Sequence, residues 1–85
     1  MDRSILVGKI AGFLFVYNAL DVASITEKEL EFLIKDKLET ASFVEILINT
    51  IIIRAKKHKG IDIELVKELL LELEKIRLDL EYENM

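Results

Sequence analysis

The C-terminal segment carries two apolar stripes on one helix, and this pattern restricts the fold more than any other feature. Over residues 63–82 the first stripe alternates spacings of three and four residues, as in the buried seam of a coiled coil. The second stripe lies about 170° away around the same helix. One neighbouring helix cannot cover both stripes, so the segment must lie between several neighbours or meet another chain. The seam is Val66, Leu69, Leu73, Ile76 and Leu80, and the second stripe is Leu71, Leu78 and Tyr82.

Capping patterns mark where three of the helices begin. Thr26 and Glu29 have the spacing of a capping box, in which each side chain bonds to a free backbone N–H group of the first turn. Ser42 and Glu45 repeat this spacing, and Asp62 is an N-cap residue for the last segment. Together with the apolar spacing, these signals divide the chain into four helices. The predicted helices span about residues 4–23, 27–39, 43–59 and 63–82.

The third segment also has a feature of a strand. Residues 48–53 are rich in β-branched side chains, which favour strands over helices. Three other signals favour a helix: the capping spacing at its start, the basic residues in its last turn, and Gly60 just beyond it. We therefore expect a helix here, with a strand over residues 43–55 as the alternative.

The first segment, residues 4–23, is apolar on every side. Such a helix is either buried all round in a protein or placed in a membrane. Lys9, Asn18 and Asp21 interrupt it, whereas a spanning helix needs ~20 nearly uninterrupted apolar residues. The sequence therefore favours a central helix of a bundle, and association with a membrane through this segment is the less favoured alternative.

Four helices with short connections predict an all-α antiparallel bundle in a single domain of 85 residues. The last two helices, joined through residues 60–62, are expected to form a C-terminal hairpin. The third helix has a second apolar pair, Ile46 and Ile53, roughly opposite its main apolar face. Small domains without disulfides often gain stability from a second subunit, and this chain contains no Cys. We therefore expect a homodimer.

The surface for the second chain or another protein is predicted from the apolar side chains that the bundle leaves uncovered. The second stripe of residues 63–82 and the second pair of the third helix provide most of it. Phe32 joins them because it lies on the charged side of its own helix. The predicted interface residues are Leu71, Leu78, Tyr82, Ile46, Ile53 and Phe32.

No catalytic or metal-binding pattern is present in the sequence. Without Cys there is no thiol nucleophile and no Cys-based metal site. His58 is the single histidine, and no nucleophile-elbow glycines flank any serine. A glycine-rich phosphate loop is also missing. We therefore expect a protein that is not an enzyme and uses neither a metal nor a cofactor.

Positive charge is concentrated in one short tract, residues 54–59, between two acidic segments. The chain as a whole carries a formal charge of −4, so only a local cluster of bases suits a nucleic acid. The tract is more simply explained by cations at the negative end of a helix dipole. Its possible nucleic-acid contacts are Arg54, Lys56, Lys57 and Lys59.

These observations favour a small acidic protein that binds itself, and an unknown protein partner, through apolar helix faces. Such a protein would act as an interaction or regulatory module. The first alternative is a dimeric regulator that binds nucleic acid through residues 54–59, and the second is a membrane-associated protein. The absence of Cys leaves a cytoplasmic location as the default expectation.

Overall fold

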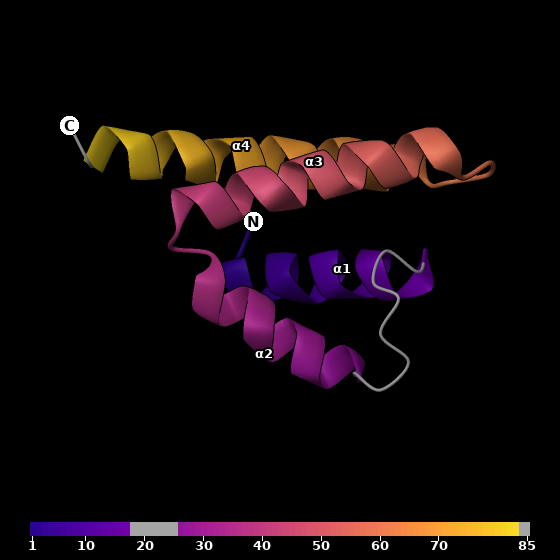
Figure 1. Cartoon of the computed structure of the whole chain (residues 1–85), viewed down its shortest axis with the longest axis horizontal. Coiled ribbons are helices and arrows are strands. Elements are labelled where there is room, and N and C mark those ends of the chain that lie inside the picture. Colours follow the sequence, from indigo (N-terminus) through magenta and orange to yellow (C-terminus); the bar gives the residue numbers. More distant parts are fainter. Residues whose placement is uncertain (18–25, 84–85) are drawn as a thin grey trace.

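The computed structural model describes residues 1–17 and 26–83, and within these ranges it is all-helical. The predicted all-α class is therefore confirmed, and the third segment is a helix rather than a strand. Figure 1 shows the helices arranged in two layers, with α3 and α4 above α1 and α2. The helices of the described ranges are α1 (Arg3–Val16), α2 (Glu27–Lys37), α3 (Ala41–Lys57) and α4 (Ile63–Glu83).

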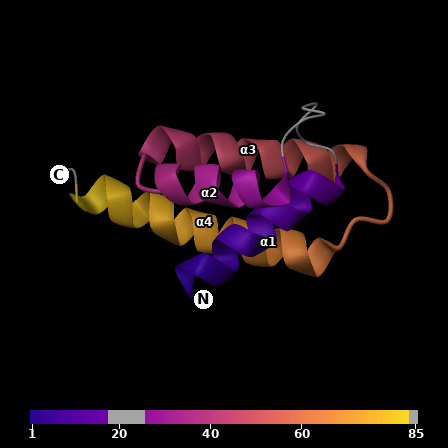
Figure 2. The same ribbon diagram turned by 90° about the horizontal axis from the view of Figure 1, so that it is seen from below.

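Each layer is a pair of helices that are neighbours in sequence. The most extensive packing is between α3 and α4, followed by that between α1 and α2. α1 also crosses α4, and this contact joins the two layers (Figure 2). Across the same crossing, the Lys9 ammonium donates a hydrogen bond of 2.6 Å to Glu68. The arrangement fits a bundle and includes the predicted hairpin of the last two helices.

Side-chain caps explain where α2 and α4 begin, as Asp2 does for α1 through a hydrogen bond of 2.9 Å from the backbone N–H of Ser4. The Thr26 hydroxyl accepts a hydrogen bond of 3.1 Å from the backbone N–H of Glu29, at the start of α2. The Asp62 carboxylate accepts one of 3.1 Å from the backbone N–H of Leu65, at the start of α4. Each cap satisfies an N–H group that has no partner within its own helix. The starts of α2 and α4 agree with the sequence-based prediction.

The start of α3 differs from the prediction. The helix begins at Ala41 with Thr40 as its N-cap residue, so Ser42 lies inside the first turn and does not cap it. α2 ends earlier than expected, at Lys37, and the next residue, Leu38, is fully buried. Only residues 38–40 separate the two helices, and Leu38 places its side chain in the core. The backbone N–H of Thr40 donates to the Lys37 carbonyl oxygen within that turn.

The first helix is not buried all round, which corrects the prediction of a central helix. α1 has 14 residues and packs on α2 and α4, which leaves Ile5, Phe15 and Val16 exposed to solvent. The rest of the predicted segment, residues 18–23, lies outside the described residues. Of the helices that are described, none has the length and apolar character needed to cross a membrane.

The core contains apolar side chains from all four helices, and the predicted seam of α4 is part of it. Val66, Leu69, Leu73 and Ile76 are buried, and Leu80 is half-buried against them. The core also contains Leu47, which the helical pattern of the third segment did not single out. The remaining core side chains are Leu6, Val7, Ile10, Ala11, Phe13, Leu14, Leu30, Ile34, Leu38, Val44 and Ile51.

Candidate interaction surface

The second apolar stripes of α3 and α4 are both exposed along their hairpin. Ile46, Ile53, Leu71 and Leu78 are between 49% and 58% exposed. On each helix the stripe lies opposite the residues that are buried in the shared core. The stripes therefore point away from the α1–α2 layer. We call these four residues together with Tyr82 the outer face.

The four apolar side chains of the hairpin are arranged in two equally spaced pairs. Seven residues separate Ile46 from Ile53, and seven separate Leu71 from Leu78, which is two helical turns or about 10.5 Å in each case. Asn49 lies midway between the first pair and shares a shallow depression with Glu74, which lies midway between the second pair. The midpoints of the two pairs therefore lie at similar heights along the hairpin.

Tyr82 extends this surface along the last turn of α4. Its side chain is 80% exposed, the largest exposed fraction among the bulky apolar residues that the structure describes. It follows Leu78 by four residues, so that it lies one turn further along the same side of the helix. The outer face is therefore longer on α4 than on α3.

Arg77 organises the charges beside the outer face. Its guanidinium donates to both carboxylate oxygens of Glu74, with an Nε–Oε2 distance of 3.1 Å. A further hydrogen bond of 2.6 Å joins Nη1 of Arg77 to Glu81. The hydrogen bonds from Arg77 hold the pKa of Glu74 below its ordinary value, and the same contacts raise the pKa of Arg77. Sequence reasoning missed Glu74 here, although its i, i+3 spacing to Arg77 is a known signal.

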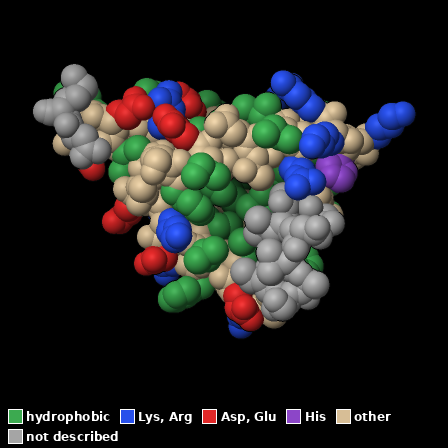
Figure 3. Space-filling view, viewed as in Figure 1, with side chains coloured by type: hydrophobic (Ala, Val, Ile, Leu, Met, Phe, Trp, Pro, Cys, Tyr) green, Lys and Arg blue, Asp and Glu red, His purple; other side chains and the backbone are tan. Residues whose placement is uncertain are grey.

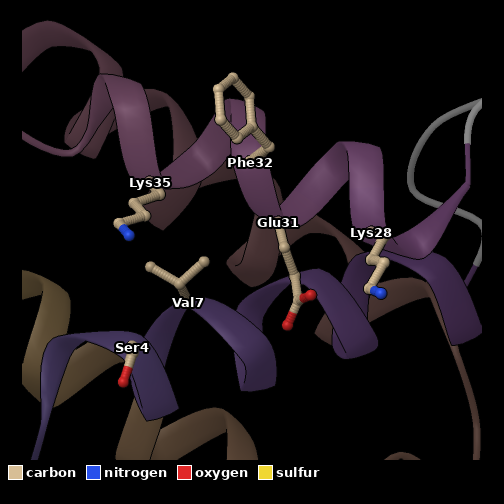
Figure 4. A pocket seen from close by; sticks show the side chains of 6 residues that line it. All are labelled: Ser4, Val7, Lys28, Glu31, Phe32 and Lys35. Carbon is tan, nitrogen blue, oxygen red and sulfur yellow. The ribbon is translucent and has the colours of Figure 1, made fainter.

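Phe32 does not join the other predicted interface residues. It lies on α2, in the layer opposite α3 and α4 (Figure 1), and is 76% exposed. Together with Val7 and two lysines it lines an open depression of about 270 Å³ between α1 and α2. In Figure 4 its ring points away from α1, while Glu31 reaches toward α1 between Lys28 and Lys35. The structure therefore separates the six predicted residues into two surfaces.

The basic tract lies at one end of the molecule. Arg54, Lys56 and Lys57 occupy the last turn of α3, and Lys59 is in the turn that leads to α4. Figure 3 shows Lys and Arg side chains gathered around the single histidine at this end. Within the described ranges, no carboxylate lies within 4 Å of the Lys56, Lys57 or Lys59 ammonium group. We call these three lysines and Arg54 the basic end.

The turn between α3 and α4 is held against the end of α1. His58 is half-buried, and its ring centroid lies 5.6 Å from that of Tyr17. The Tyr17 hydroxyl accepts a hydrogen bond of 3.4 Å from the backbone N–H of Asp62. Gly60, with a φ of 77°, supplies the left-handed backbone conformation that this turn requires. The turn that contains Lys59 and follows the rest of the basic end is thereby tied to the bundle.

No grouping of three or more His, Cys, Asp or Glu side chains able to hold a metal ion occurs within residues 1–17 and 26–83. Comparisons with protein-family models, with curated proteins and with solved structures give no match to this chain. The candidate surfaces are therefore the outer face, the depression beside Phe32 and the basic end.

Proposed function

We propose that the protein is a non-enzymatic interaction module that forms a homodimer through its outer face. The observation that carries this proposal is that the two apolar pairs on α3 and α4 lie at similar heights. In a symmetric dimer the same surface is used by both copies, so it must match itself after a rotation of 180°. The two apolar pairs of the outer face suit this requirement, and Tyr82 lies beyond them on α4.

A single twofold axis would pair the exposed apolar side chains of α3 and those of α4 at the same time. The axis lies in the plane of the interface, runs across the helices, and passes at the height of Asn49 and Glu74. Because the two midpoints lie at similar heights, the rotation places Ile46 opposite the partner's Ile53. It places Leu71 opposite the partner's Leu78 at the same time. A register that suited only one helix would leave the other pair exposed.

Lys75 limits the strength of this dimer. It lies between Leu71 and Leu78 along α4, close to the proposed axis, where it approaches the partner's Lys75. Like charges that face each other oppose association, although Glu72, 3.4 Å from the Lys75 ammonium, partly balances the charge. We therefore expect a reversible dimer whose population depends on protein concentration. In this dimer the surface around Phe32 on α2 stays open to another protein.

The test is the native mass in solution, measured by sedimentation equilibrium over a range of protein concentrations. The variant carries Leu71→Glu and Leu78→Glu, which place four charges in the dimer interface. We expect a monomer–dimer equilibrium for the unchanged protein and a monomer for this variant.

The matched control carries Phe32→Glu and Leu33→Glu, which add the same charge on exposed side chains of α2. Helical circular dichroism checks that every variant is folded. We expect the control to dimerise like the unchanged protein. A protein that is monomeric at every concentration contradicts the proposal, and so does a dimer that only the control variant disrupts.

A further inference from the structure

We propose that the basic end binds the phosphate backbone of a nucleic-acid duplex without reading its sequence. Three lysines of this end have no carboxylate within 4 Å among the described residues, so their charges are not neutralised by close ion pairs. By contrast, Lys9, Lys75 and Arg77 each have a carboxylate partner on α4. The basic end is therefore a local concentration of positive charge on an acidic protein.

The chemistry of the basic end suits phosphates rather than bases. A lysine ammonium group is a compact point charge that binds a phosphate without a fixed geometry. Adenine is read by Asn or Gln in a groove, and residues 54–59 contain neither. Aromatic rings read single-stranded bases by stacking on them. The nearby rings of Tyr17 and His58 are half-buried and packed against each other, so they do not offer a free stacking surface.

The proposed homodimer would present the basic end twice, and this step rests on the proposed function. The twofold axis crosses α3 at the height of Asn49, and Lys57 lies eight residues further along. At 1.5 Å per residue this is about 12 Å, so the two copies place their basic ends roughly 25 Å apart, at opposite ends of paired α3 helices. A straight duplex covers that distance with about seven base pairs.

The expected signature is a steep dependence of affinity on salt concentration. Each phosphate that a cation neutralises adds about −0.9 to the slope of log K against log salt on duplex DNA. Three lysines in each of two copies predict a slope of about −5 for the dimer. A single copy predicts a slope of about −3.

The experiment measures binding of the full chain to a 20-base-pair DNA duplex of arbitrary sequence by fluorescence anisotropy, over a series of salt concentrations. The test variant carries Lys56→Glu and Lys57→Glu. The control carries Lys28→Glu and Lys35→Glu, which change the net charge equally at two exposed lysines of α2. We expect the test variant to bind at least ~10-fold more weakly at low salt. The control should keep most of the affinity.

The outcomes separate this inference from the proposed dimer. If the unchanged protein does not bind the duplex, or if both variants weaken binding equally, the basic end is not a phosphate site. Binding to vesicles of anionic lipid but not to the duplex also overturns the inference. The monomeric Leu71→Glu, Leu78→Glu variant tests the second step, which is that the dimer binds the duplex with both of its basic ends. A slope of about −3 for this variant supports two basic ends acting together in the dimer. An unchanged slope from a monomer contradicts that step alone.

Discussion

Arg77 shows how one residue can order the surface of a helix beside an apolar stripe. Its planar guanidinium engages both oxygens of Glu74 and reaches Glu81 one turn away. Two-point contacts of this kind fix geometry better than single ion pairs do. Lys75 makes a separate contact of 3.4 Å with Glu72, whereas Asp79 has no cation within 4 Å among the described residues.

The Arg77–Glu74 contact predicts a dependence of stability on pH. Hydrogen bonds from Arg77 lower the pKa of Glu74 in the folded protein relative to its ordinary value of 4.5. A carboxyl group whose pKa is lower when folded stabilises the fold above its unfolded pKa, and this contribution is lost as the pH falls through the folded pKa. We therefore expect Glu74→Gln to lower the thermal midpoint at pH 7 but to have a smaller effect at pH 3.

The matched control for this prediction is Asp79→Asn, which removes a charge that has no close cation within the described ranges. Thermal unfolding followed by circular dichroism at both pH values measures the two variants. Equal effects of Glu74→Gln at pH 7 and pH 3 would contradict the assignment.

At the scale of elements, local signals predicted the helices well and their ends less well. The starts of α2 and α4 depend on Thr26 and Asp62, whose capping bonds form within three residues of sequence. The start of α3 follows instead a short turn in which Leu38 is buried as part of the core. Similarly, one side of α1 is exposed because its neighbours, α2 and α4, do not surround it. Tertiary packing decided both features, so the sequence pattern could not supply them.

For the candidate surface, too, the pattern along one helix could be predicted from the sequence, whereas the alignment between helices could not. The helical pattern of α4 identified Leu71 and Leu78 as uncovered, because this follows from spacing along a single helix. That Asn49 lies at a similar height to Glu74 depends on how α3 is aligned with α4, and no local pattern encodes that alignment. The separation of Phe32 from the other residues likewise depends on which helices share a layer.

The two stripes of α4 predict effects of very different size for the same substitution. Leu73 is fully buried, so Leu73→Ala leaves a cavity and should cost about 2–5 kcal/mol of unfolding free energy. Leu71 is 58% exposed, so Leu71→Ala should change the stability of the monomer by less than about 0.5 kcal/mol. Urea unfolding at low protein concentration measures both values. A large loss from Leu71→Ala under these conditions would place Leu71 in the monomer's own core.

At the scale of the whole molecule, dimerisation should make thermal stability depend on concentration. A partner that binds only the folded chain stabilises it by mass action, so the thermal midpoint rises with protein concentration. We expect this rise for the unchanged protein and its absence for the Leu71→Glu, Leu78→Glu variant. Scanning calorimetry over a tenfold range of concentration provides the measurement. A midpoint that is independent of concentration in both proteins contradicts self-association.

The placement of the two tyrosines gives the molecule a pair of built-in optical reporters. The chain contains no tryptophan, so Tyr17 and Tyr82 supply its intrinsic fluorescence. Tyr17 is half-buried where the turn between α3 and α4 meets α1, whereas Tyr82 lies open on the outer face. A Tyr82→Phe variant therefore reports through Tyr17 on whether the two layers stay together, and Tyr17→Phe reports through Tyr82 on whether the outer face is covered. Assembly and unfolding can thus be followed by emission and quenching without attaching a dye.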